Sequence, residues 1–187
     1  ATGARGHRPF QDRAAAPAYL LIDLPSGRTL AESGRRVLDT PVAPGSIAKL
    51  ATLAAALESG AVNGDTRIMC RRRADVDGRV IECVHPDLHR PLDPVEALGY
   101  SCNAYFASIA RSLDRGALSQ MFARLGLSPL APGSPTVSGA LGLAGIRATP
   151  RQLLEAFLRV AGTSRTEIRL DETSRSVLRR GMELAAR

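Results

Sequence analysis

Lysine is nearly missing from this 187-residue chain: of its 25 basic residues, only Lys49 is a lysine and the others are arginine. Tryptophan is absent and aromatic residues make up 4% of the sequence, so few side chains are available to stack on nucleic-acid bases. The arginines behind the net charge of +7 are scattered, and residues 71–73 form the only run of three. We therefore interpret the charge as a general preference for arginine over lysine, and expect no nucleic-acid partner.

Long apolar runs are also missing. The longest, over residues 18–22 and 140–146, are much shorter than the ~20 residues that a bilayer-crossing helix needs. The first ten residues lack the apolar core of a secretion signal. With 44% hydrophobic and 23% charged residues, the composition is that of a globular domain.

The pattern along the chain predicts one β-hairpin followed by a mainly helical part. Residues 1–17 show no periodicity and are expected to form a tail or linker. Two strand-like runs, residues 18–24 and 28–32, flank a Pro-Ser-Gly turn. Helical spacing and capping signals then predict helices over residues 46–58, 93–98, 103–113, 119–125, from 149 onwards and 172–187, with a loop over residues 128–147.

The lone lysine stands three residues after Ser46, in the run PGSIAKL. Positions i and i+3 lie on one face of a helix, so the hydroxyl of Ser46 and the amine of Lys49 can meet. A serine hydroxyl becomes a good nucleophile when a neighbouring base takes its proton. A desolvated lysine can be that base, whereas arginine stays protonated, so this spacing predicts a nucleophile and its base.

A second candidate motif is Ser101-Cys102-Asn103, at the start of the helix predicted over residues 103–113. Ser101 could relay protons, while the carboxamide of Asn103 could hold a substrate amide or orient the lysine. The simpler interpretation is that Ser101 only caps the helix.

Together these motifs resemble the transpeptidase domain of penicillin-binding proteins, in the serine acyltransferase superfamily that also contains the β-lactamases. The resemblance extends to AYLLIDLPSGRTLAES, LDPVEALGYSCNAYFASIA and GIRATPRQLLEAFLRVAG. It implies an α+β fold of the penicillin-binding-protein/β-lactamase type. Residues 18–187 would form a partial transpeptidase domain, with residues 18–39 as a hairpin of its sheet and residues 40–187 as its mainly helical part.

The resemblance also implies roles for the motif residues. Ser46 would be the acylated nucleophile, with its backbone N–H in the oxyanion hole, and Lys49 would be the general base. Ser101 would shuttle the proton and Asn103 would bind the backbone amide of the acyl donor. The implied substrate is a D-Ala-D-Ala peptidoglycan stem peptide or a β-lactam that mimics it, with no cofactor.

The family's third motif, Lys-Thr-Gly, has no counterpart in this sequence. We therefore expect these residues to be part of a longer chain, or to be completed by another polypeptide. The implied function is a D,D-transpeptidase or carboxypeptidase outside the cytoplasmic membrane, tethered to that membrane and working with other cell-wall synthesis proteins. The alternatives are a β-lactamase or β-lactam sensor, for which no deacylation base is evident, and a non-catalytic binding or scaffold module.

The cysteines allow several interpretations. Cys70 and Cys83 flank an Asp-Gly turn, which favours a disulfide between them in an extracytoplasmic protein, with two reduced buried cysteines as the alternative. A zinc site formed by these two with His85 and His89 lacks the usual short first spacing, so no metal is expected. Cys102 is interpreted as a small core residue.

Overall fold

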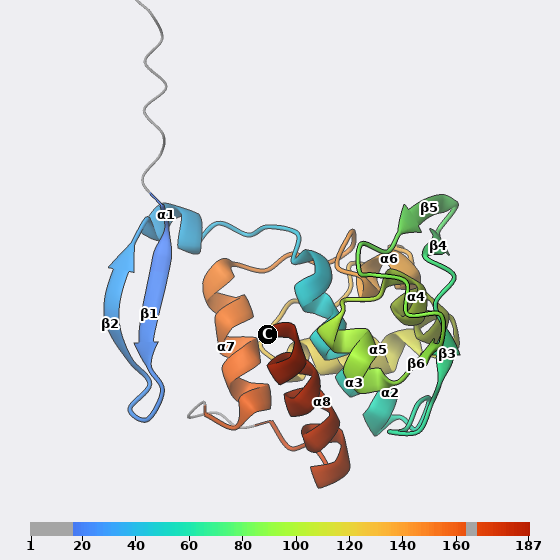
Figure 1. Cartoon of the computed structure of the whole chain (residues 1–187). Helices are drawn as coiled ribbons and strands as arrows, with labels where there is room; N and C mark the ends of the chain where they lie inside the picture. Colours follow the sequence, from blue (N-terminus) through green and yellow to red (C-terminus); the bar gives the residue numbers. More distant parts are fainter. Residues whose placement is uncertain (1–16, 164–167) are drawn as a thin grey trace, which may run out of the picture.

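A computed structural model describes residues 17–163 and 168–187 (Figure 1), so the predicted tail at residues 1–17 lies outside the described part apart from Pro17. An N-terminal hairpin precedes a mainly helical part that contains two more short strand pairs. The strands are β1 (Tyr19–Asp23), β2 (Arg28–Ser33), β3 (Ile68–Met69), β4 (Arg73–Val76), β5 (Arg79–Glu82) and β6 (Pro91–Leu92). The helices are α1 (Arg35–Leu38), the 3₁₀ turn η1 (Gly45–Ile47), α2 (Ala48–Glu58), α3 (Pro94–Gly99), α4 (Asn103–Ser112), α5 (Arg115–Arg124), α6 (Thr136–Ala140), α7 (Pro150–Ala161) and α8 (Glu172–Ala185).

Helix α2 forms the centre of the helical part. Every residue from Ala48 to Ala56 is buried, and all of them except Lys49 and Thr52 are apolar. Helices α3, α4, α5, α6 and α8 all contact it. The predicted helix over residues 46–58 is thus confirmed, and its position encloses Lys49 within the core.

The predicted N-terminal hairpin is confirmed as the antiparallel pair β1–β2, with an irregularity in register between Leu21 and Ile22. It stands at the edge of the molecule beside α7 (Figure 1). Arg151 of α7 binds the carboxylates of Glu32 and Asp39 at 3.1 and 3.0 Å, which ties the hairpin and the segment after it to the helical part. About half of the Leu21 surface remains exposed, at 55%.

The predicted turn at Asp77-Gly78 is confirmed as the tip of the β4–β5 hairpin. Both residues have positive φ, 52° and 83°, which is the conformation of a two-residue type I′ turn. The carboxylate of Asp77 accepts the backbone N–H of Ser138 at 2.9 Å, so the tip is fixed to α6. At the other end of β5, the carbonyl of Glu82 and the sulfur of Cys83 accept hydrogen bonds from the first residues of α4.

Two helices begin where capping residues close together in the sequence predicted them. The capping boxes Asp93/Glu96 and Thr149/Gln152 both form, at the N-termini of α3 and α7. Helix α5 begins four residues earlier than predicted because the carboxylate of Asp114 caps it. The loop predicted over residues 128–147 contains α6, and α1 and the β3–β6 pair were also not predicted. None of the helices in the described ranges is both long and apolar enough to span a membrane.

Candidate active site

The amine of Lys49 lies where the two sequence motifs meet. Its Nζ atom is 3.1 Å from Ser46 Oγ and 3.0 Å from Ser101 Oγ. It also donates to the backbone carbonyl of Ser101 at 2.7 Å and to Asn103 Oδ1 at 2.6 Å. Ser101 and Asn103, which follow Lys49 by 52 and 54 residues in the sequence, thus contact its amine together with Ser46. The four predicted site residues form one constellation.

Burial changes the proton affinity of this amine. Lys49 is 1% exposed, and loss of hydration lowers its pKa to about 8, because a desolvated ammonium is disfavoured. Negative charge on the nearby sulfurs of Cys102 and Cys83 acts in the opposite direction and raises the pKa. The ring of Phe106, with its centroid 5.6 Å from Nζ, supplies a further favourable contact for the charged form. Near neutral pH, Lys49 can therefore exist as either an ammonium or a free amine.

Ser46 is held by a segment that pairs with a distant loop. Val42 exchanges two backbone hydrogen bonds with Ala148, at 2.9 and 3.0 Å. The N–H of Gly45 donates to the carbonyl of Gly142 at 3.0 Å. Ser46 follows in η1, at the N-terminal end of α2, with its side chain on the exposed side. The pairing sets the position from which the hydroxyl faces Lys49.

Gly142 leaves no space for a side chain beside this turn. A Cβ atom there would lie 2.1 Å from the carbonyl oxygen of Gly45 and 2.8 Å from Ala48 Cβ, and its φ is +72°. We expect Gly142→Ala to lower the free energy of unfolding by about 2–4 kcal/mol, measured by chemical denaturation. Displacement of Ser46 should also slow its acylation at least about tenfold.

Gly133→Ala is the matched control, because Gly133 has the same φ of +72° but no atom within 4 Å of the added Cβ. It should show only the backbone strain of about 1–2 kcal/mol, with acylation unchanged. Equal effects of the two substitutions would contradict a role for Gly142 in placing Ser46.

Ser101 has an unusual backbone conformation that the sequence analysis missed. Its φ is +53°, in the left-handed region that favours glycine. It occupies the position after the C-cap of α3: its N–H donates to the Leu98 carbonyl at 3.0 Å, and the N–H of Cys102 donates to the Ala97 carbonyl at 2.9 Å. This is a Schellman motif with serine in the place usually taken by glycine. The strained turn directs both the carbonyl and the hydroxyl of Ser101 to Lys49.

The simpler interpretation, that Ser101 caps the next helix, is wrong. The N-cap of α4 is Cys102, whose sulfur accepts the N–H of Tyr105 at 3.4 Å. Asn103 is fixed at both ends of its carboxamide, because Oδ1 accepts from Lys49 and Nδ2 donates to the Glu82 carbonyl at 2.7 Å. Of the two expected tasks of Asn103, orienting the lysine is the one that these contacts display.

An apolar pocket opens beside the two serines. Its volume is about 330 Å³. It is lined by residues of η1, α2, α3, α7 and α8 together with Ser101, namely Ser46, Ile47, Leu50, Leu98, Gly99, Ser101, Phe157, Met182 and Ala185. A ligand that reaches the hydroxyl of Ser46 would have an apolar surface next to it.

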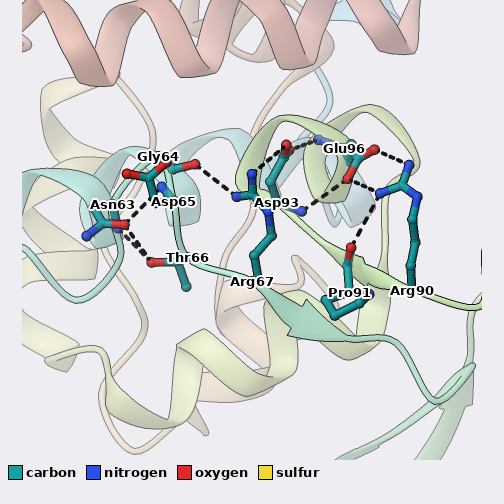
Figure 2. Close-up of polar contacts among 9 residues, drawn as sticks. All are labelled: Asn63, Gly64, Asp65, Thr66, Arg67, Arg90, Pro91, Asp93 and Glu96. Carbon is teal, nitrogen blue, oxygen red and sulfur yellow. Dashed lines mark hydrogen bonds and ion pairs between the residues drawn. The ribbon is translucent and has the colours of Figure 1, made fainter.

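A second cavity, of about 680 Å³, lies beside a polar network between the end of α2 and the start of α3 (Figure 2). In that network Arg67 approaches Asp93 at 3.7 Å, and Arg90 forms an ion pair with Glu96. The side-chain oxygen of Asn63 accepts from two groups of the following turn. These polar groups bind one another and hold the N-terminus of α3, the helix that ends next to Ser101.

The disulfide predicted between Cys70 and Cys83 is not formed. Both are free thiols with Sγ atoms 3.6 Å apart, beyond the ~2.05 Å of a disulfide bond. Cys102 and His85 share the same space, with Sγ of Cys102 3.8 Å from Sγ of Cys83. Cys102 is buried, as expected of a core residue, but the sequence analysis missed its contact with the other cysteines.

Comparison with protein-family models assigns residues 18–161 to the penicillin-binding protein transpeptidase domain. The chain belongs to this family. Its α+β fold is the fold of the transpeptidase domain, as the sequence motifs predicted. Proteins of this family act in peptidoglycan cross-linking outside the cytoplasm, and their kind of reaction is that of a serine acyltransferase.

Solved structures of the family share this fold at low sequence identity. A peptidoglycan synthase complex that coordinates polymerization and crosslinking matches with a TM-score of 0.72 and 21% identity, over 90% of this chain and 42% of that one. The transpeptidase domain of Burkholderia pseudomallei penicillin-binding protein 3 matches with a TM-score of 0.67 and 19% identity, over 89% of this chain and 60% of that one. Pseudomonas aeruginosa PBP2, solved in complex with WCK 5153, matches with a TM-score of 0.64 and 18% identity, over 80% of this chain and 45% of that one.

The chain therefore spans about half the length of these solved chains. A search of curated protein sequences finds no match.

Proposed function

We propose that the chain supplies the nucleophile and base of a penicillin-binding D,D-transpeptidase, which cross-links peptidoglycan through an acyl-enzyme at Ser46. The contact of a buried, partly deprotonated Lys49 with Ser46, Ser101 and Asn103 carries this proposal. Residues 18–39 would form a hairpin of the domain's sheet and residues 40–187 its mainly helical part, with residues 1–17 as a tail or linker.

Proton transfer follows from the geometry around Nζ. In its neutral form the amine keeps one lone pair, which can accept the Ser46 proton across 3.1 Å while the other contacts orient it. As Oγ attacks the carbonyl carbon of the D-Ala-D-Ala bond, its proton passes to Lys49. Ser101 Oγ, 3.0 Å from the same nitrogen, can then carry a proton to the leaving amine of the terminal D-alanine.

The N-terminal position of Ser46 on the η1–α2 helix favours the oxyanion that develops at the substrate carbonyl. The backbone N–H of Ser46 and the helix dipole both present positive charge there. Asn103 Oδ1 has a second lone pair with which to accept the backbone N–H of the acyl donor. The apolar pocket beside Ser46 offers a surface for the apolar part of the stem peptide.

The substrate would be a stem peptide ending in D-Ala-D-Ala, or a β-lactam that acylates the same serine. The place of action would be the periplasmic or extracytoplasmic side of the membrane, with the whole protein tethered there beside other cell-wall synthesis proteins. No cofactor takes part in this proposal.

Labelling of the whole protein with a fluorescent penicillin tests the proposal. We expect a stable covalent adduct in the natural protein and in Ser108→Ala, a control at an exposed serine of α4, and none in Ser46→Ala. An adduct that is lost within seconds to minutes would favour a β-lactamase instead. No adduct in the natural protein would contradict the transpeptidase proposal and favour a non-catalytic module.

A further inference from the structure

A cluster of three thiols and one imidazole lies directly behind the Ser101–Asn103 turn. The ligand atoms of Cys70, Cys83, His85 and Cys102 all lie within 4.8 Å of one another. Cys83, His85 and Cys102 are buried, and Cys70 is partly buried against the core. The residues come from three places in the chain, namely the segment before β4, the segment after β5 and the N-cap of α4.

Three of the six separations within the cluster match those of a tetrahedral metal site, and the other three are at most 4.8 Å. Metal–sulfur bonds of about 2.3 Å and a metal–nitrogen bond of about 2.0 Å require ligand–ligand separations of about 3.5–3.8 Å in a tetrahedron. The sulfur of Cys70 is 3.6 Å from that of Cys83 and 3.5 Å from His85 Nε2, and the sulfurs of Cys83 and Cys102 are 3.8 Å apart. A metal ion bound between these atoms would require the remaining separations, none longer than 4.8 Å, to close to about the same range.

Each sulfur of Cys70, Cys83 and Cys102 also accepts a backbone hydrogen bond. The donors are the N–H groups of Arg72 to Cys70 at 3.3 Å, Ala104 to Cys83 at 3.4 Å and Tyr105 to Cys102 at 3.4 Å. Such donors stabilise negative charge on sulfur, and a thiolate is the form that binds metal. The backbone on all three sides therefore favours thiolates at this point.

His85 is oriented as a metal ligand. Its Nδ1 lies 2.7 Å from the carbonyl oxygen of Pro86, which can only accept, so Nδ1 carries the proton. In the neutral ring this leaves the Nε2 lone pair directed at the cluster, 3.5 Å from the sulfur of Cys70. A backbone carbonyl that fixes the second ring nitrogen is the usual support of a metal-bound histidine.

The nearby guanidinium of Arg72 balances the charge that a bound site would carry. Three thiolates and a neutral imidazole around a divalent ion leave one negative charge. Arg72 places its guanidinium on this cluster by donating to the backbone carbonyls of His85 and Cys83, the latter at 3.1 Å. Of the run of three arginines at residues 71–73, Arg72 is thus the one placed beside the buried ligands.

We propose that Cys70, Cys83, His85 and Cys102 bind one Zn²⁺ ion in a tetrahedral structural site. Three sulfur donors with one imidazole nitrogen suit zinc, and the three thiol protons pass to solvent on binding. This proposal replaces the expectation that no metal is bound. It also differs from the zinc site considered from the sequence, because Cys102 takes the place of His89 as the fourth ligand. His89 is excluded because its side chain is 85% exposed.

The ion would connect the β4–β5 hairpin to the start of α4 at the candidate active site. Cys102 stands between Ser101 and Asn103, and Cys83 follows Glu82, whose carbonyl binds Asn103 Nδ2 at 2.7 Å. Bound zinc would therefore hold the strained Ser101 turn and the Asn103 carboxamide against Lys49. Its role would be positioning, since its four ligands include neither Ser46 nor the Lys49 that contacts it.

Metal content of the whole protein tests the proposal without reference to acylation. Purified with zinc in the medium and without chelating resins, the protein should contain about one zinc per chain by elemental analysis. Cobalt exchanged for zinc should give the intense sulfur-to-metal charge-transfer bands and visible bands of tetrahedral thiolate coordination. Neither measurement depends on a variant that folds.

Variants then assign the ligands. Cys102→Ser and His85→Gln should lower the metal content to less than half, whereas the control His89→Gln should keep one zinc per chain. A protein that takes up no zinc or cobalt, whether as three free thiols or with a Cys70–Cys83 disulfide, would overturn the proposal. Equal metal content in His85→Gln and His89→Gln would overturn the assignment of His85.

Discussion

Replacing Lys49 with arginine should reduce the rate of acylation of Ser46 by a β-lactam about 10³-fold. Arginine keeps a positive charge, so the free-base form that takes the Ser46 proton is lost. Its guanidinium is also too large for a position that is 1% exposed and surrounded by acceptors at 2.6–3.1 Å. The acylation rate constant, measured by stopped-flow or by timed labelling, checks this.

Two further variants separate the loss of the base from other effects. Lys49→Met keeps the length of the side chain without a base, and should lose acylation to a similar extent. Arg36→Lys makes the reverse exchange at an exposed position and should leave the rate unchanged. A Lys49→Arg protein that is folded, as judged by its melting curve, and still acylated at more than about a tenth of the natural rate would contradict the assignment of Lys49 as the base.

Acylation should also depend steeply on pH. Because burial lowers the pKa of Lys49 to about 8, the fraction of free amine rises about tenfold per pH unit below that value and levels off above it. The acylation rate constant should therefore increase about 50-fold between pH 6 and pH 8 and change little from pH 9 upwards. The direction is an increase with pH, since the active form is the deprotonated one.

The measurement is the acylation rate constant of the whole protein between pH 5.5 and about 9.5, at one ionic strength. The residual rate of Lys49→Met is the control, and it should lack the inflection near pH 8. A rate that is constant or falls across this range would show that the ammonium form, or another group, is the active one.

Much of the fold is predictable because its signals are local. The β1–β2 turn, the Asp77-Gly78 hairpin and the capping boxes of α3 and α7 involve neighbouring residues, and all are present. Short elements were missed because contacts distant in sequence define them. Helix α6, for example, lies in a glycine-rich run and packs against α2 and α4.

The candidate site divides in the same way. The spacing of Ser46 and Lys49 predicts their contact, because one helix carries both. The left-handed conformation of Ser101 was missed, since the glycine that usually marks this position is replaced by serine. The contact of Cys102 with Cys83 and Cys70 was missed because 19 and 32 residues separate them, and no short spacing marks the set. A cysteine directly inside the second motif was the available signal.

Peptide mapping of the acylated protein tests the central claim most directly. After reaction of the whole protein with a D-Ala-D-Ala thioester analogue or a penicillin, trypsin cleaves at Arg36 and Lys49 and releases residues 37–49, in which Ser46 is the only serine. Ser101 lies in a different tryptic peptide, residues 80–111, since the Arg90-Pro91 bond resists trypsin. We predict that the acyl group is found on residues 37–49, at Ser46. An adduct on residues 80–111, or on neither peptide, would contradict the account.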